Sequence, residues 1–419
     1  MTEREAVGTT DRSAGAVDRL FRHERGRAVA ALIRATGDFD LAEESVQEAF
    51  EAALRRWPRE GVPVSPGAWI VTTARNRAID RLRRDRVGRA KVEASERLRE
   101  LQTMTDDPAE IPDERLRLIF TCCHPALPID ARVALTLRTV GGLTTREIAR
   151  AFLSSEPAIQ QRIVRAKRKI REAAIPYRVP PPELMRNRRD GVLAVLYLIF
   201  NEGYGATQGT YIRRDLCDEA IWLTRVLNGL LPVDPEVRGL LALMLLQHSR
   251  RDARTDDAGR LVLLQEQDRA RWDHDAIDEA LAMLDETLEL RAPGPYQLQA
   301  AIAALHARAP RPEHTDWPQI AALYGALARM EPGPVVELNR AVAVAMADGP
   351  GPGLTLVEPL ADRLDGYHLF HSARADLLMR LERREEALEA YRRAAELATA
   401  PAEREFLARR IAEASASGP

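Results

Sequence analysis

Residues 66–84, with the sequence PGAWIVTTARNRAIDRLRR, constrain the fold of this chain more than any other stretch. If Pro66 and Gly67 end a loop and a helix starts near Ala68, the helix has one apolar and one polar face. The apolar stripe comprises Val71, Ala74, Ala78, Ile79 and Leu82. The polar face comprises Thr73, Asn76, Arg77, Asp80, Arg81 and Arg84. Guanidinium and amide groups contact phosphates and base edges, so the stretch indicates a helix that lies along DNA, or else a solvated arginine-rich face.

Length and composition favour an all-α chain of two or three domains. The chain has 419 residues, aromatic residues make up only 5% of it, and long alternating β-branched runs are absent. No apolar run approaches the roughly 20 residues that span a bilayer, and the polar N-terminus does not resemble a signal peptide. Three cysteines, Cys122, Cys123 and Cys217, suit a reducing compartment. We therefore expect a soluble, cytoplasmic protein without a membrane partner.

The formal net charge of −2 conceals a basic front half and an acidic back half. Up to residue 180 the chain has 33 Lys and Arg against 26 Asp and Glu, about +7 in net charge, which leaves about −9 for the remainder. A basic front half is compatible with a nucleic-acid partner.

An acidic helix is predicted immediately before the basic one, in DFDLAEESVQEAFEAALRRW at 38–57, with Asp40 as its N-cap. Its buried positions are predicted as Leu41, Val46, Ala49, Phe50 and Ala53, and its outward positions as Asp38, Glu43, Glu44, Gln47, Glu48 and Glu51. A loop at 57–67 follows, which is either a connector or a pocket for an unstacked base. The charged, proline-containing residues 85–112 are predicted to form a linker.

Residues 141–171 fit a helix-turn-helix. Two short helices precede it within residues 113–139, the second with Asp130 as a possible cap. Thr144 is predicted to cap the first helix of the motif, and the second starts near Ser155. The inner stripe of the second helix is Ile159, Ile163, Ala166 and Ile170, and its outward residues are Gln160, Gln161, Arg162, Arg165, Lys167, Arg168 and Lys169. A basic amphipathic helix can bind a membrane or a partner protein, but the preceding helix and turn favour DNA.

After the proline-rich boundary at 175–184 the chain is predicted to be helical, with paired helices between 317 and 415. Trp317, Ile320, Ala321 and Tyr324 partly match the first helix of a tetratricopeptide repeat, and Ala387, Tyr391 and Ala394 partly match the second. We expect a helical platform for a partner or for the front half of the chain.

The sequence offers little support for catalysis or metal binding. Walker, dinucleotide-binding, nucleophile-elbow and HExxH motifs are absent. The run Cys122-Cys123-His124 lacks a second ligand cluster, so a small buried cysteine pair is favoured over a metal site. The aspartates Asp252, Asp256, Asp257, Asp268 and Asp273 favour a salt-bridged surface over a cleft. We expect no cofactor and no catalytic residues.

Taken together, the front of the chain resembles the extracytoplasmic-function sigma factors of bacterial RNA polymerase. The stretch at 38–57 is similar to their region 2.1–2.2, the stretch at 66–84 to region 2.3–2.4, and LTLRTVGGLTTREIARAFLSSEPAIQQRIVRAKRKIR to region 4. The resemblance covers about residues 15–175, and three motifs in order make it specific. The back half, with FNEGYGA at 200–206, resembles the subgroup with a C-terminal extension of tetratricopeptide character.

The resemblance implies region 2 at 15–86, a linker at 87–112, region 4 at 113–175 and a helical extension at 183–415. Core RNA polymerase and promoter DNA would be the partners, and the chain would catalyse no reaction. The acidic extension would either mask the DNA-binding faces or be required for activity, through an intramolecular contact or a protein partner.

The resemblance also assigns roles to individual residues. The residues implied to dock on core polymerase are Asp40, Glu44, Gln47, Glu48 and Phe50. The loop from Trp57 to Ser65 would capture a base flipped from the −10 element. The residues implied to hold the upstream part of that element are Asn76, Arg77, Asp80, Arg81 and Arg84. The residues implied to read the −35 element in the major groove are Gln160, Gln161, Arg162, Arg165 and Arg168.

Two other hypotheses about the function remain open at this point. The first is a helix-turn-helix regulator that binds an operator without polymerase, which dimers and palindromic sites would favour. The second is a helical enzyme with its active site in 190–290, for which the sequence offers no acid/base pair.

Overall fold

The structure is a computed structural model that describes residues 24–84, 99–102, 114–152, 154–205, 213–256 and 258–416. Within these ranges every regular element is a helix, apart from one isolated bridge between Thr255 and Leu261. The prediction of an all-α fold is confirmed. The predicted linker at 87–112 lies outside the described residues except for 99–102, and so does Asp257. Among the described helices none combines the length and apolarity that a membrane crossing requires.

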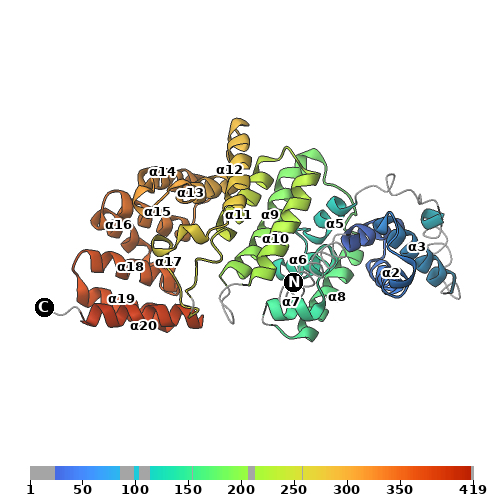
Figure 1. Cartoon of the computed structure of the whole chain (residues 1–419), viewed down its shortest axis with the longest axis horizontal. Coiled ribbons are helices and arrows are strands. Elements are labelled where there is room, and N and C mark those ends of the chain that lie inside the picture. The colour runs from blue at the N-terminus through green and yellow to red at the C-terminus, as the bar shows by residue number, and fades with distance from the viewer. Residues whose placement is uncertain are drawn as a thin grey trace, which may run out of the picture. The chain divides into compact units, whose positions relative to one another are not determined.

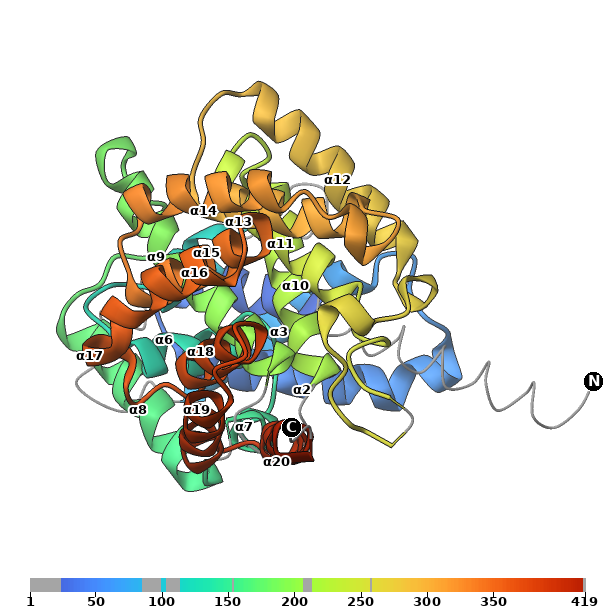
Figure 2. The same ribbon diagram turned by 90° about the vertical axis from the view of Figure 1, so that its left-hand side faces the viewer.

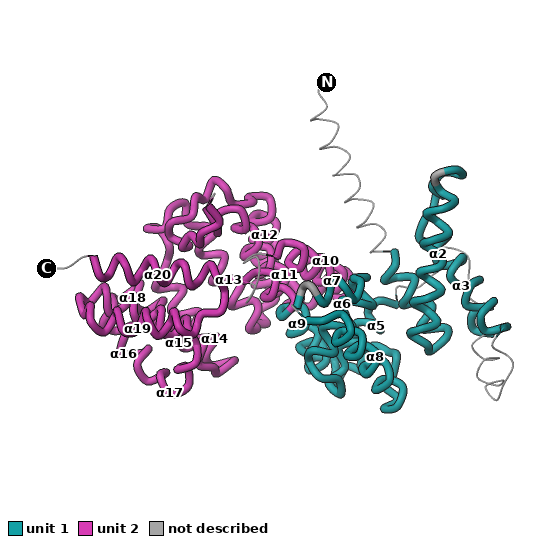
Figure 3. The backbone as a smooth tube through the Cα atoms, turned by 90° about the horizontal axis from the view of Figure 1, so that it is seen from below, with its two compact units in different colours: residues 1–198 teal, residues 199–419 magenta. Residues whose placement is uncertain are grey.

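The chain divides into two compact units, residues 1–198 and 199–419 (Figures 1 and 3). Helix α9 (Pro182–Tyr204) contributes to both units, because its first part belongs to unit 1 and its last turns to unit 2. Within unit 1, Arg188 of α9 donates from Nη2 to the carbonyl oxygen of Phe120 at 2.6 Å.

Unit 1 contains two groups of helices. The first group is the helix over residues 24–36 and the packed pair α2 (Phe39–Glu60) and α3 (Pro66–Arg84). The second group is α5 (Arg115–Cys122), α6 (Ile129–Thr139), α7 (Thr145–Ala151) and α8 (Glu156–Glu172). Helix α8 packs on both α6 and α7. Each group buries its own apolar stripe, as the periodicity of the sequence predicts.

The boundaries of α2 and α3 correct three predictions. Asp38, not Asp40, is the N-cap of α2, because its Oδ1 accepts from the amides of Asp40 at 3.0 Å and Leu41 at 3.1 Å. Helix α2 continues to Glu60 and ends at Gly61, whose φ of 84° favours glycine. Trp57 therefore lies in the helix rather than in a loop. Helix α3 starts at Pro66, a residue suited to the first helical position, rather than at Ala68.

The predicted stripe of α3 is largely confirmed. Val71, Ala74, Ala78 and Leu82 are buried, but Ile70 completes the stripe and Ile79 is only half-buried. Before the helix-turn-helix, Asp130 was predicted as a cap, but Pro128 occupies the N-cap position of α6 and Asp130 lies in its first turn.

Unit 2 begins with the last turns of α9 and continues as a succession of helices. They are α10 (Arg214–Leu230), α11 (Pro235–His248), α12 (His274–Glu289), α13 (Pro295–Arg308), α14 (Trp317–Met330), α15 (Pro334–Ala347), α16 (Pro350–Val357), α17 (Ala361–Leu364), α18 (His368–Arg380), α19 (Arg384–Leu397) and α20 (Pro401–Ala416). From α13 to α16 each helix packs on the next, as Figure 2 shows. The same holds for α18, α19 and α20.

The tetratricopeptide-like positions lie in these helix pairs. Ala387, Tyr391 and Ala394 are buried on α19, and Ile320 is buried on α14. Between α11 and α12, Asp252 pairs with Arg214, Asp256 with Arg260 and Asp273 with Arg251. These ion pairs agree with the predicted salt-bridged surface, and the tetratricopeptide assignment stays a prediction.

Gly203, in the FNEGYGA stretch, allows α9 to approach the start of α10 closely. A Cβ atom at this position would lie 2.8 Å from the amide nitrogen of Cys217 and 2.9 Å from the carbonyl oxygen of Arg213. These are backbone atoms, so the neighbouring helix would have to shift to accept any side chain.

Replacing Gly203 by alanine should therefore lower the free energy of unfolding of unit 2 by about 1–3 kcal/mol, measured by urea titration of the full chain. Gly229→Ala in α10 is the matched control, since a Cβ there meets no atom within 4 Å. The control should be neutral or stabilise by up to ~1 kcal/mol through higher helix propensity. Equal effects of the two substitutions would contradict the close approach.

Candidate nucleic-acid interface

A side chain caps the start of each helix of the helix-turn-helix. Thr144 and Glu147 form a reciprocal capping box, in which the Thr144 hydroxyl accepts from the Glu147 amide at 3.1 Å and the Glu147 carboxylate accepts from the Thr144 amide at 2.6 Å. Ser155 caps α8 by accepting from the amide of Ala158 at 3.3 Å. The predicted cap at Thr144 and the predicted helix start near Ser155 are both confirmed.

The outward face of α8 has the predicted composition with one exception. Gln160, Gln161, Arg165 and Arg168 are exposed, and Arg162 is half-buried. Together with the start of α6 this face lines a groove of about 580 Å³. The side chains there are held by weak exposed contacts, such as Arg165 Nη2 to Gln161 Oε1 at 3.0 Å and Arg162 Nη2 to Asp130 Oδ2 at 3.9 Å. Such contacts are readily exchanged for a ligand.

The polar face of α3 contacts the acidic face of α2. Asn76, Arg77, Asp80 and Arg84 are exposed. Arg81 forms ion pairs with both Glu44 and Glu48 of α2. The residues implied to hold the −10 element and those implied to dock on polymerase therefore partly neutralise each other in the chain without its partners. Gln47 is exposed, and Glu48 and Phe50 are half-buried.

The connection between α2 and α3 is short and presents apolar side chains to solvent. The exposed fraction of Val62 is 65%, and that of Val64 is 107%. At the two ends of this connection the rings of Trp57 and Trp69 meet edge to face with centroids 5.4 Å apart. Ser65 is half-buried at the end of this connection. Exposed valines beside paired indoles form an apolar surface on which a base can stack.

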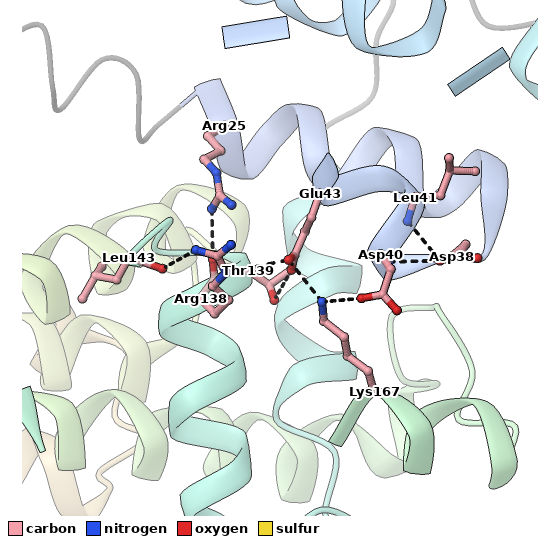
Figure 4. Close-up of polar contacts among 9 residues, drawn as sticks. All are labelled: Arg25, Asp38, Asp40, Leu41, Glu43, Arg138, Thr139, Leu143 and Lys167. Atoms are coloured by element: carbon pink, nitrogen blue, oxygen red, sulfur yellow. Dashed lines mark hydrogen bonds and ion pairs between the residues drawn. The ribbon is translucent and has the colours of Figure 1, made fainter. Parts of the chain in front are cut away.

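Lys167 is the exception on α8, because it was predicted to face outward and is instead 8% exposed. Its Nζ donates to Asp40 Oδ1 at 2.9 Å and to Glu43 Oε2 at 3.1 Å, both on α2 (Figure 4). Glu43 was also predicted to face outward and is also 8% exposed. A helix implied to read DNA and a helix implied to dock on polymerase are thus joined by an ion cluster in which Lys167 and Glu43 are buried and Asp40 is exposed.

The Glu43 carboxylate has two further partners from region 4. Its Oε1 accepts from the Thr139 hydroxyl at 3.2 Å, and its Oε2 lies 3.8 Å from Arg138 Nε. Arg25 donates from Nη1 to the carbonyl oxygen of Arg138 at 3.0 Å (Figure 4). Burial, followed by the nearby positive charge of Arg138, lowers the pKa of Arg25, and Glu43 opposes this.

Sequence reasoning missed Lys167 and Glu43, although a signal was present. Lys167 follows Ile163 by four residues and precedes Ile170 by three, so it borders the buried stripe of α8. Glu43 stands in the same relation to Phe39 and Val46 on α2. A charged residue at the edge of a buried stripe can face a second domain as well as solvent.

The cysteine pair before α6 is buried, as predicted. Burial raises the pKa of Cys122 well above its ordinary value and that of Cys123 to about 11. Cys123 Sγ lies 3.4 Å from the Thr136 hydroxyl. Both thiols are therefore protonated at neutral pH, and the protonated form is a poor nucleophile. The part of the chain that the structure describes holds no cluster of three His, Cys, Asp or Glu residues that would suit a metal ion.

Three family models match the chain. They are sigma-70 region 2 over residues 20–87, sigma-70 region 4 over residues 117–170, and a family of unknown function, DUF6596, over residues 188–288. The first two contain the helices that were predicted to meet DNA, and the third begins within α9.

Curated relatives match the chain in two different ways. An uncharacterized protein of Rhizobium meliloti is 48% identical over 400 residues, which cover 94% of each chain. The ECF RNA polymerase sigma factor SigK of Mycobacterium tuberculosis is 28% identical over 156 residues, which cover 36% of this chain and 82% of SigK. The probable ECF RNA polymerase sigma factor SigI of the same species is 28% identical over 171 residues, 40% of this chain and 58% of SigI. No solved structure matches the chain.

The ion pairs of Arg81 should contribute little to stability, because all three side chains are partly exposed. Exposed pairs are worth roughly 0.2–1 kcal/mol each, so Arg81→Gln should lower the free energy of unfolding by about 1 kcal/mol or less in a urea titration. Arg83→Gln, an exposed arginine two positions on, is the control and should have no measurable effect. A loss of more than about 2 kcal/mol for Arg81→Gln would show that these groups are not available for exchange with a partner.

Proposed function

Because this chain belongs to the extracytoplasmic-function family of sigma-70 factors and carries a C-terminal helical extension, we propose that it binds core RNA polymerase and directs it to promoters with two elements. Region 2 would engage the −10 element and region 4 the −35 element. The observation that carries this proposal is the pair of exposed cationic faces, on α3 and on α8, each supported by its own buried stripe.

The exposed groups on α8 match the chemistry of duplex recognition. Arginine and glutamine side chains make bidentate contacts with base edges in the major groove, and each such contact is worth roughly 1–3 kcal/mol of discrimination. The proposed readers are Gln160, Gln161, Arg162, Arg165 and Arg168. The Ser155 cap fixes the start of α8, which a reading helix requires, and the capping box fixes the start of α7 before it.

The exposed groups of region 2 match a different task. The connection between α2 and α3 offers Val62, Val64 and the Trp57–Trp69 pair to an unstacked base. Asn76, Arg77, Asp80 and Arg84 are exposed on α3 beside it for the upstream phosphates and bases. On α2, Glu44, Gln47 and Glu48 would dock on polymerase together with Phe50 and Asp40. We assign no reaction to the chain itself.

The extension is proposed to modulate this activity. Its acidic character, about −9 in net charge after residue 180, suits either contact with basic surfaces or recruitment of a further partner. The paired helices α14–α15 and α18–α19 offer the kind of platform that protein ligands use.

Promoter-directed transcription tests the main proposal. We expect the full chain with core polymerase to yield transcripts from defined start sites on a genomic DNA library, preceded by two shared elements. Arg165→Gln combined with Arg168→Gln should reduce these transcripts at least tenfold through lost base and phosphate contacts, without weakening polymerase binding. Arg178→Gln combined with Arg186→Gln, at two exposed arginines beyond α8, is the charge-matched control. Polymerase-independent binding to palindromic sites as a dimer would instead support an operator-binding regulator.

Truncation tests the role of the extension. Removing residues 206–419 keeps α9 whole, and with it the contact between Arg188 and the Phe120 carbonyl in unit 1. We expect promoter-dependent transcription or DNA affinity of the truncated chain to differ from that of the full chain by several-fold. Circular dichroism controls for folding of the remaining helices. Unchanged transcription together with unchanged DNA affinity would remove the proposal that the extension modulates activity.

A further inference from the structure

The connection between α11 and α12, residues 249–273, carries a cluster of arginines within unit 2 (Figure 1, yellow). Arg250 is half-buried near its start, Arg254 is buried, and Arg269 is half-buried in the short 3₁₀ helix η2 (Arg269–Arg271). Long connections with little regular structure are uncommon in compact domains and often carry function. The proposed function makes no use of this arginine cluster.

Two aromatic side chains gather the three guanidinium groups. The centroid of the Trp272 ring lies 6.0 Å from the guanidinium carbon of Arg250 and 4.7 Å from that of Arg269. The guanidinium carbon of Arg254 lies 3.5 Å from the centroid of the Tyr204 ring. The Tyr204 hydroxyl in turn accepts from Arg250 Nη2 at 2.7 Å. Three positive charges therefore lie close together.

The hydrogen-bond partners of Arg250 and Arg269 are neutral. Nη2 of Arg250 donates to the Tyr204 hydroxyl and to Oε1 of Gln247. Nη1 of Arg269 donates to two backbone carbonyl oxygens at the end of α13. Among the described residues neither guanidinium forms an ion pair with a carboxylate. Guanidinium groups withdrawn from water are usually paired with carboxylates, so these two carry positive charge that the described chain does not balance directly.

The pKa values of groups in the cluster reflect this positive charge. Burial and the charge of Arg254 lower the pKa of Arg250. Burial and then Arg250 lower the pKa of Arg269, and the opposing effect of Glu313 is smaller than either. Burial, followed by the charges of Arg250 and Arg269, lowers the pKa of His306 to about 4. A bound anion would offset the positive charge that these groups share.

Several donors of the cluster make no hydrogen bond within the part of the chain that the structure describes. The indole nitrogen of Trp272, a residue that is 4% exposed, and Nε of Arg269 are both buried and have no acceptor there. Nη2 of Arg269 and both Nη1 and Nε of Arg250 also donate to none of the described groups. A buried donor without an acceptor is costly and rare in folded proteins. A bound anion would supply the missing acceptors.

We propose that this cluster is a binding site for a small ligand that carries a phosphate group, held by Arg250, Arg269 and the indole of Trp272. One guanidinium fork is enough for a planar carboxylate, whereas two forks and an indole N–H suit the tetrahedral oxygens of phosphate. Trp272 and Arg254 are buried, which favours a small ligand over the backbone of a nucleic acid. The site goes beyond the proposed function and does not depend on it, because binding involves neither polymerase nor promoter.

Calorimetric titration of the full chain at neutral pH and constant ionic strength tests the ligand class. The probes are inorganic phosphate, glycerol 2-phosphate as a phosphate monoester, and acetate as a planar carboxylate. We expect saturable binding of one ligand per chain for at least one phosphate probe and none for acetate. Binding of the ester alone would show that the ligand is larger than phosphate. Failure of both phosphate probes to saturate below about 10 mM would contradict the proposal, as would equal binding of acetate.

Substitutions locate the site. Arg250→Gln and Arg269→Gln should each weaken phosphate binding at least about tenfold, because each removes charged donors from the anion. Arg271→Gln is the matched control, since Arg271 is exposed in the same short helix, and it should bind within about twofold of the unaltered chain. Equal binding by all four chains would overturn the proposal. So would R250Q if it weakened binding of non-promoter DNA while leaving phosphate binding unchanged. Circular dichroism controls for folding, and either folded variant suffices.

Titration of His306 in the unaltered chain locates the anion independently. The ring signal is followed by nuclear magnetic resonance and assigned with His306→Gln. Phosphate bound to Arg250 and Arg269 offsets their charge, so the pKa of His306 should rise when phosphate is added. An unchanged pKa at saturating phosphate would place the anion elsewhere and contradict the proposal. This measurement decides alone if neither arginine variant folds.

Discussion

A buried lysine shared by two carboxylates joins the two parts of unit 1. Ions of opposite charge lose favourable hydration when they leave water. Hydrogen bonds from several sides are needed to compensate for this loss. Lys167 donates hydrogen bonds to Asp40 and Glu43. The Glu43 carboxylate in turn accepts one from Thr139 and lies near Arg138. This polar cluster therefore helps to fix the position of α8 relative to α2, together with contacts such as that of Arg25 with the Arg138 carbonyl.

The exposed charges obey a different rule from the buried ones. Arg81 pairs with Glu44 and Glu48 at the surface of region 2, where water competes and each pair contributes little. Such groups can exchange one partner for another at small cost. The same chain thus uses ion pairs in two ways, with a desolvated pair of Lys167 and Glu43 inside unit 1 and solvated pairs that are proposed to exchange for DNA or polymerase.

Local features of the sequence predicted the fold well. The stripe of Ile159, Ile163, Ala166 and Ile170 on α8 and the caps at Thr144 and Ser155 follow from helical periodicity and from unsatisfied amides at helix starts. The cap of α2 was misplaced because Asp38 and Asp40 are both suitable residues at neighbouring positions. Glu43 and Lys167 were misplaced because a helical wheel identifies the polar face but not the domain that the face meets. The roles of the individual DNA and polymerase contacts depend on partners and stay predictions.

The central claim is the proposed function, in which core polymerase places the cationic faces of α3 and α8 on two different promoter elements, farther apart than in the free chain. Energy transfer between dyes at Arg59→Cys in α2 and Glu172→Cys in α8 measures this directly, since both positions are exposed and the three native cysteines are buried. The account predicts a short distance in the free chain and a longer one in the complex with core polymerase and promoter. A distance that stays short in a transcriptionally active complex would contradict it.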